Sequence, residues 1–280
     1  MSYHEIRAKI NAKCMEIQAH TPDVAQVKDI LILPSKIPLR LYFPTTQQRC
    51  PLILLIHGGA WVAGNLDTHD NLARYLCSEV EAVVVSVSYL NAPEGKFPLQ
   101  LEQCYEALLW TTQNIKDLNI NDKIAIVGDS SGGNMAAALC MMVRDRQGPK
   151  LSYQVLINPA LDLSCEGTLQ PQGDRLDFLR WQASMYVKKP DEVYHPYVSP
   201  LLGDNLKSLP PALILVAEHD DLRKAGEAYV EKLRLAQVPT EIYCQMNSNH
   251  LAGNGARASD IARESLDIAV AALRNALLFP

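Results

Sequence analysis

The sequence predicts an α/β protein with a mostly parallel central sheet that is flanked by helices, and three observations support this class. The chain of 280 residues is 48% hydrophobic and 20% charged, which is enough apolar material for one large domain core. Short apolar segments alternate along the chain with longer segments of helical spacing. The apolar segments are continuous rather than alternating, as expected for strands that are covered on both faces.

The expected elements begin with an N-terminal helix and a pair of edge strands. Residues 2–20 have helical spacing of apolar residues, and residues 27–43 predict two antiparallel edge strands around a Pro-Ser-Lys turn. Six further strands are predicted at 52–56, 83–87, 124–127, 153–157, 213–216 and 241–245. Helical spacing predicts helices at 70–79, 99–116, 133–146, 222–236 and 256–278.

One long segment interrupts the alternation of strands and helices. Residues 162–208 are polar and rich in aromatic residues and proline, and loops of this length are uncommon unless they are functional. We interpret this segment as a helical cap insertion after the sixth strand, which lies over one edge of the sheet. An N-terminal cap helix region, residues 1–24, joins it, and the main domain comprises residues 25–161 and 209–280.

The sequence Gly128-Asp129-Ser130-Ser131-Gly132 matches the pattern G-x-S-x-G between a predicted strand and an Ala-rich helix. This context is the one that the motif requires for a nucleophilic serine. A serine at the apex of a sharp strand-to-helix turn has a strained backbone, and small flanking residues let the strand and the helix approach each other. The pattern therefore predicts Ser130 as a nucleophile, which needs a base and donors for an oxyanion.

The sequence His57-Gly58-Gly59-Ala60 follows a predicted strand directly. Small residues allow backbone N–H groups to point at a ligand without interference from side chains. We expect the amides of Gly59, Ala60 and Ser131 to form an oxyanion hole. His57 is expected to fix this loop by hydrogen bonds rather than to act as the base.

The motifs HGGAW and GDSSGGN, together with the cap-like insertion, resemble those of the hormone-sensitive-lipase-like family of α/β-hydrolase carboxylesterases. The resemblance covers nearly the whole chain from about Leu39. It implies the α/β-hydrolase fold, ester hydrolysis through a serine, and no metal or organic cofactor. The sequence departs from the family pattern at four places: Ala60 for the third glycine, Ser131 for alanine, Asp221 for proline, and Leu251-Ala252 for Gly-Phe.

The acid and the base of a catalytic triad are expected after the last two strands. By its match to the family's D-P-L motif, Asp220 is the acid, and Asp221 is expected to cap the following helix. His250, in the loop after the final strand, is the expected base, with His195 of the insertion as its competitor. The chain order Ser130, Asp220, His250 is that of the α/β hydrolases.

The substrate is expected to be a small-molecule ester with a short to medium acyl chain. Because apolar pockets discriminate chain length only weakly, we expect promiscuity toward small esters. The possible pocket walls are Trp61, Tyr89, Phe178, Trp181, Met185, Tyr186 and Tyr194. Two alternatives remain open. The first is an amidase, formamidase or deacetylase, which would use the same triad. The second is a non-catalytic small-molecule binding protein, like the plant gibberellin receptors that resemble this family. Those receptors lack the triad histidine, whereas this sequence has His250.

Charge and cysteine content restrict the partners and the compartment. A net charge of −5 disfavours nucleic acid as a partner. The chain has no apolar run of about 18 residues that would span a membrane, and its first residues lack a signal-peptide core. Seven cysteines without C-x-x-C spacing predict free thiols in a reducing cytoplasm. The family includes monomers and homodimers, and the sequence does not choose between them.

Overall fold

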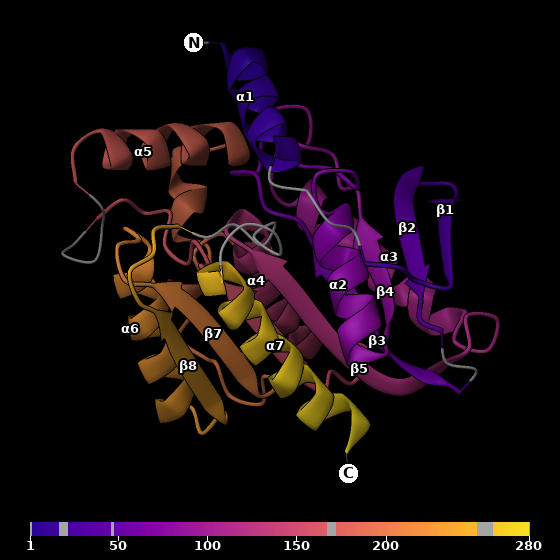
Figure 1. Cartoon of the computed structure of the whole chain (residues 1–280). Coiled ribbons are helices and arrows are strands. Elements are labelled where there is room, and N and C mark those ends of the chain that lie inside the picture. Colours follow the sequence, from indigo (N-terminus) through magenta and orange to yellow (C-terminus); the bar gives the residue numbers. More distant parts are fainter. Residues whose placement is uncertain (1, 17–21, 46–47, 167–171, 251–259, 280) are drawn as a thin grey trace.

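The computed structural model describes residues 2–16, 22–45, 48–166, 172–250 and 260–279. Eight strands of these residues form one sheet in the order β1-β2-β4-β3-β5-β6-β7-β8 (Figure 1). The strands are β1 Gln26–Ile32, β2 Ile37–Phe43, β3 Cys50–Ile56, β4 Val83–Val87, β5 Ile120–Asp129, β6 Tyr153–Ile157, β7 Ala212–Ala217 and β8 Thr240–Gln245. Strand β2 is antiparallel to both of its neighbours, and β4, β3 and β5 to β8 are parallel.

Helices cover both faces of the sheet. Helices α2 (Asp70–Val80) and α7 (Asp260–Leu278) pack on one face, and α3 (Leu99–Gln113), α4 (Ser131–Asp145) and α6 (Arg223–Leu235) pack on the other. Consecutive residues of β3 belong to opposite cores because side chains alternate along a strand. This explains why the strands are apolar throughout rather than alternating. Within the described residues, no helix is both long enough and apolar enough to cross a membrane.

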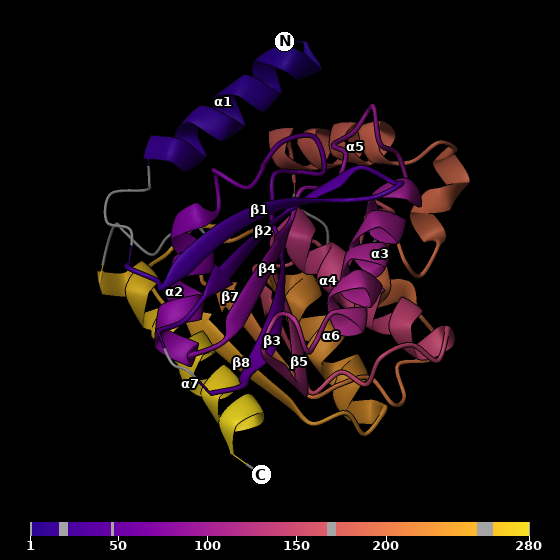
Figure 2. The same cartoon turned by 90° about the vertical axis from the view of Figure 1, so that its right-hand side faces the viewer.

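A helical cap lies above the sheet, as the sequence predicted. It consists of α1 (Tyr3–Glu16), α5 (Asp174–Tyr186) and two 3₁₀ turns, η1 (Pro190–Tyr194) and η2 (Pro200–Leu202). Figures 1 and 2 both show α1 and α5 at the same end of the molecule, above the carboxyl ends of the parallel strands. The cap is thus built from the N-terminus and from the insertion after β6, while its boundaries at 1–24 and 162–208 stay a prediction.

Some elements differ from the sequence-based expectation, mostly at their ends. Strand β5 begins at Ile120, four residues before the predicted start, and a register shift against β3 accommodates its polar beginning. Helix α6 has Leu222 at its N-cap position and no side-chain cap, so the expected capping by Asp221 is wrong. Asp220 instead accepts the Leu222 N–H. The predicted start of the last helix, 256–259, lies outside the described residues.

All seven cysteines are free thiols, in agreement with the absence of a disulfide pattern in the sequence. Five of them are buried. Burial raises the pKa of the Cys77 thiol to about 12 and that of Cys165 to about 11. These two thiols therefore remain protonated and weakly nucleophilic at neutral pH.

Candidate active site

Ser130 occupies the turn between β5 and α4 with a strained backbone. Its φ is 52° and its ψ is −118°, a combination that residues with a side chain rarely adopt and that costs about 1–3 kcal/mol. The surroundings hold this conformation at both backbone groups. The Ser130 N–H donates to the Ile157 carbonyl at 2.8 Å, and the Ser130 carbonyl accepts the N–H groups of Asn134 at 3.0 Å and Ala160 at 3.2 Å.

Two glycines allow the strand and the helix to meet at this turn. A Cβ atom added to Gly128 would collide with the carbonyl oxygen of Gly132, and one added to Gly132 would collide with the carbonyl oxygen of Ile56. The close approach of backbone to backbone therefore requires glycine at both positions. The small residues around Ser130 are thus a steric requirement of the turn, as the sequence indicated.

The side chains of Ser130, His250 and Asp220 form a continuous hydrogen-bonded row. His250 Nε2 lies 3.0 Å from Ser130 Oγ, and His250 Nδ1 lies 2.8 Å from Asp220 Oδ2. The three residues come from loops at the carboxyl ends of β5, β8 and β7, which meet at one edge of the sheet. The Asp220 side chain is only 4% exposed, whereas the His250 side chain is 31% exposed. The arrangement allows a proton to pass from the hydroxyl to the imidazole.

Asp220 is stabilised as a carboxylate by three donors. Burial raises its pKa, but hydrogen bonds from His250, the Leu222 N–H and the Asn158 amide outweigh the burial and leave the pKa below its ordinary value. Asn158 Nδ2 lies 3.0 Å from Asp220 Oδ2. Sequence reasoning missed Asn158, although it directly follows β6, between the strands that carry Ser130 and Asp220.

The loop after β3 has unusual backbone geometry. Gly59, Ala60 and Trp61 have φ values of 133°, 57° and 60°. The Gly59 carbonyl accepts the N–H groups of Val62 and Ala63 at 3.1 and 2.9 Å, which closes a tight turn. Among the described residues, the amide N–H groups of Gly59 and Ala60 have no backbone or side-chain acceptor. These amides are therefore available to a ligand.

A buried carboxylate ties this loop to the serine turn. Asp129 directly precedes Ser130 and has no solvent exposure. Its Oδ1 accepts the Gly58 N–H at 3.0 Å and lies 3.1 Å from His69 Nε2. The two candidate sources of oxyanion donors are thus fixed relative to each other. His69 was not singled out in the sequence, because it lies at the far end of the same connection, directly before α2, and matches no motif.

His57 is buried beneath the same loop. Burial lowers its pKa to about 3, so the imidazole is neutral at ordinary pH. Its ring stacks on Tyr89 at a centroid distance of 4.2 Å, and the Tyr89 hydroxyl donates to the His57 carbonyl at 2.7 Å. His57 Nδ1 lies 2.9 Å from the Gly58 carbonyl oxygen, which requires the proton to be on Nδ1. These contacts agree with an expected role in fixing the loop.

The residues expected as pocket walls fall into two groups. Trp61, Tyr89 and Tyr186 have 0%, 2% and 0% exposure, so no ligand reaches them in this structure, and the expectation of a wall is corrected for these three. The Trp61 and Tyr186 rings stack at 5.1 Å and join the cap to the core. The remaining residues lie on the cap. Phe178 stacks on Trp181, and the Tyr194 hydroxyl donates to Glu166. Met185 and Trp181 both pack against the apolar cluster of Val62, Ala63 and Ala92.

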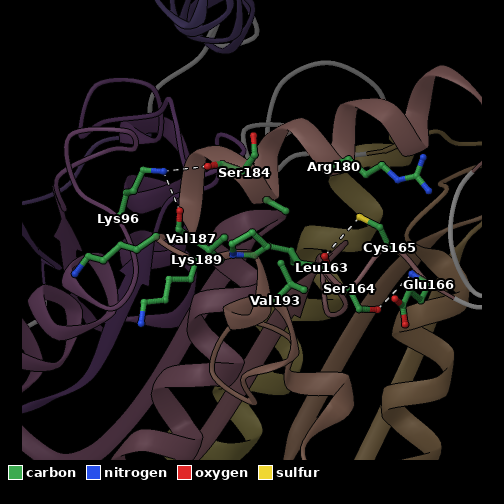
Figure 3. A pocket seen from close by; sticks show the side chains of 13 residues that line it. Lys96, Leu163, Ser164, Cys165, Glu166, Arg180, Ser184, Val187, Lys189 and Val193 are labelled. Carbon is green, nitrogen blue, oxygen red and sulfur yellow. Dashed lines mark hydrogen bonds between the residues drawn. The ribbon is translucent and has the colours of Figure 1, made fainter.

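A cavity of about 440 Å³ lies between α5, η1 and the segment that follows β6 (Figure 3). Its apolar side includes Leu163, Ala183, Val187 and Val193, and none of the aromatic residues expected from the sequence lines it. The Ala160 N–H donates to the Ser130 carbonyl. Leu163 comes three residues after Ala160, and three residues span at most about 10 Å. Ser130, His250, Gly59 and Ala60 themselves are not among the residues that line the cavity.

His195, the competitor for the role of base, lies in the cap. Its Nδ1 accepts the Tyr197 N–H at 3.0 Å, and its ring packs beside Phe97. In the described parts of the chain, no three His, Cys, Asp or Glu side chains converge in a way that would hold a metal ion.

Comparison with known proteins assigns the class. The family model of the α/β-hydrolase fold matches residues 53–252, and the chain belongs to this family, in its hormone-sensitive-lipase-like branch. Two relatives illustrate the similarity. An arylesterase of Saccharolobus solfataricus is 36% identical over 85% of this chain and 80% of its own length. Carboxylesterase NlhH of Mycobacterium tuberculosis is 37% identical over 86% of this chain and 79% of its own length.

Solved structures agree with this assignment. An esterase from Pyrobaculum calidifontis superimposes with a TM-score of 0.92 at 35% identity, covering 98% of this chain and 93% of its own. EstE1, a thermostable carboxylesterase from a metagenomic library, gives a TM-score of 0.91 at 33% identity, covering 99% of this chain and 98% of its own. The similarity thus includes the cap as well as the sheet.

Proposed function

We propose that the chain is a serine carboxylesterase that hydrolyses small esters with short to medium acyl chains. The observation that carries the proposal is the row of hydrogen bonds from Ser130 Oγ through His250 to Asp220, with distances of 3.0 and 2.8 Å. Similarity to proteins named arylesterase and carboxylesterase supports the same activity. Seven free thiols favour a reducing compartment such as the cytoplasm.

The first half of the reaction forms an acyl-enzyme. Ser130 Oγ attacks the ester carbonyl carbon while His250 Nε2 takes the hydroxyl proton, and Asp220 stabilises the resulting imidazolium. The carbonyl oxygen becomes an oxyanion, which accepts hydrogen bonds from the amides of Gly59, Ala60 and Ser131. The C–O bond to the alcohol then breaks, and His250 returns its proton to the leaving alkoxide.

The second half of the reaction releases the acid. A water molecule attacks the acyl carbon of the Ser130 ester while His250 takes one of its protons, and the same amides hold the second oxyanion. Collapse of this intermediate breaks the bond to Ser130, which regains its proton from His250.

The test is hydrolysis of p-nitrophenyl acetate, butyrate and octanoate by the wild type and by Ser130→Ala and His250→Ala. We expect each substitution to lower kcat by about 10⁴-fold or more, because triad residues act as a unit. Ser35→Ala, an exposed serine in the turn between β1 and β2, makes the same chemical change far from the site and should keep full activity.

A fluorophosphonate label separates the alternatives. An amidase of narrow specificity would be inert toward the three esters but would be labelled at Ser130. A binding protein without an activated serine would show neither turnover nor label, and this result would contradict the proposal.

A further inference from the structure

Helix α1 contacts the loop that supplies the candidate oxyanion donors. Arg7 Nε donates to the Val62 carbonyl at 2.6 Å, and one of its terminal nitrogens donates to the Ala92 carbonyl at 2.8 Å. The guanidinium is oriented by Glu94, with N–O distances of 3.1 and 2.6 Å. One turn further along α1, Asn11 Oδ1 accepts the Gly64 N–H at 2.8 Å. The helix thus binds both a carbonyl and an amide of the same loop.

The part of the loop that precedes these contacts is strained. Ala60 and Trp61 are consecutive residues with side chains in the left-handed region, at φ values of 57° and 60°. A side chain makes this region sterically unfavourable, and the conformation persists only where the surroundings fix it. On the strand side, Asp129 fixes the loop by accepting the Gly58 N–H. On the far side, α1 fixes it through Val62 and Gly64.

Packing around this point joins the two parts of the cap. Val62, Ala63 and Ala92 form a small apolar cluster against which Ile10 of α1 and Trp181 of α5 pack. Arg7 lies beside this cluster, and its side chain is 24% exposed. The ion pair with the 40% exposed Glu94 contributes little by itself, because solvent screens it. The contacts of Arg7 that matter for the loop are those with the two carbonyl groups.

We propose that Arg7 is a positioning residue for ester hydrolysis, which holds the loop after β3 in the geometry that directs the amides of Gly59 and Ala60 at the oxyanion. The inference rests on the proposed function. A guanidinium fits this place better than an ammonium, because its fixed fork reaches both carbonyls and Glu94 at once. Lysine would reach one carbonyl and restore part of the effect.

The experiment compares Arg7→Ala and Arg7→Lys with Lys13→Ala, an exposed residue of the same helix that serves as the matched control. For each protein, kcat and KM are measured with p-nitrophenyl butyrate, together with the inhibition constant of a trifluoromethyl ketone. The ketone forms an oxyanion on the serine, and it therefore reports on the oxyanion hole. Melting temperatures identify variants that merely unfold.

We expect Arg7→Ala to lower kcat about tenfold or more and to raise the inhibition constant of the ketone by a similar factor, with KM changed less than twofold. For comparison, removal of a whole oxyanion donor lowers kcat about 10²–10³-fold. Arg7→Lys should lie between Arg7→Ala and the wild type, and Lys13→Ala should equal the wild type. A folded Arg7→Ala variant with unchanged kcat, or with KM and the ketone constant raised equally, would overturn the inference.

Hydrogen exchange makes the result independent of ester hydrolysis. Amides of residues 57–64 should exchange faster in Arg7→Ala than in Lys13→Ala, while those of β5 should not change. If the wild type fails to hydrolyse esters, the proposed function fails, and the exchange comparison still decides whether Arg7 holds the loop. Equal exchange in both variants would contradict the role of Arg7.

Discussion

Replacing Asn158 with glycine isolates the contribution of one amide to the stability of the Asp220 carboxylate. The substitution removes the Nδ2 donor that lies 3.0 Å from Asp220 Oδ2. The backbone of Asn158 has a φ of 45°, and glycine adopts this region without the steric cost of other residues. The local backbone should therefore stay in place, and the Asn158 N–H should still donate to the Leu215 carbonyl.

The expected loss of stability comes mainly from the hydrogen bond. A hydrogen bond to a charged group contributes about 1.5–3 kcal/mol, and the Asp220 side chain is too buried for water to replace the donor easily. Glycine also gives the unfolded chain more freedom, at a cost of up to about 1 kcal/mol. Gln147→Gly, at an exposed residue with a φ of 54°, controls for this second effect. The free energy of unfolding should fall by about 2 kcal/mol more in Asn158→Gly than in the control.

The same change should alter the acid stability. A carboxylate with a lowered native pKa stabilises the fold above its unfolded pKa, and this stability is lost as the pH falls through the native pKa. Without the Asn158 donor the native pKa of Asp220 rises toward its ordinary value. As the pH falls below the ordinary pKa of an aspartate, Asn158→Gly should therefore lose less stability than the wild type, and the difference in stability between the two proteins should shrink.

Three measurements test these effects: unfolding with guanidinium at pH 7, acid-induced unfolding, and kcat for p-nitrophenyl butyrate. We expect kcat to fall about tenfold, because a less firmly held carboxylate orients His250 less well. The reasoning would be refuted if Asn158→Gly and Gln147→Gly unfolded at the same denaturant concentration and kcat stayed within twofold of the wild type.

Two further predictions concern the buried groups beneath the loop after β3. Asp129→Asn keeps the shape of the side chain but removes the negative charge that faces Gly58 and His69. The free energy of unfolding, measured with denaturant, should therefore fall by about 2 kcal/mol, and kcat should fall about tenfold in steady-state kinetics. Unchanged values would show that the charge is unimportant. Because burial lowers the pKa of His57 to about 3, the unfolded chain binds a proton below pH 6.5 that the native state does not. The free energy of unfolding should therefore fall by about 2 kcal/mol between pH 7 and pH 5 from this residue alone. In His57→Asn, the dependence of stability on pH should be smaller by that amount. An equal dependence in the variant and the wild type would contradict a buried neutral imidazole.

Much of the sheet was predictable because its strands are buried on both faces. The bounds of β4 (Val83–Val87) and β6 (Tyr153–Ile157) coincide with their apolar runs, since polar residues begin where the strands leave the core. Ser130 could be placed because a strained turn restricts its neighbours to small residues. His250 and Asp220 could be placed because they follow the last two strands, whose carboxyl ends lie at the same edge.

The residues that support the site could not be predicted in this way. Asn158, His69 and Arg7 contact segments that are distant in sequence, and their identities alone do not reveal these contacts. The expectation for Trp61, Tyr89 and Tyr186 failed for a related reason. A large aromatic side chain near a site can fill a core or line a pocket, and its residue type does not tell which. Only the ring contacts in the folded chain decide: Trp61 stacks on Tyr186, and Tyr89 stacks on His57.

The arrangement of the four neighbouring strands β5 to β8 has a consequence for the history of such enzymes. Ser130 and Asn158 directly follow β5 and β6, and Asp220 and His250 lie in the loops that follow the neighbouring strands β7 and β8. The insertion leaves after β6 and returns at the adjacent β7, and doubling the length of such a loop costs only about 0.6 kcal/mol of closure entropy. The cap insertion can therefore be lengthened, shortened or exchanged while the strands that precede Ser130, Asp220 and His250 keep their places, so that the cap and the candidate active site can diverge separately.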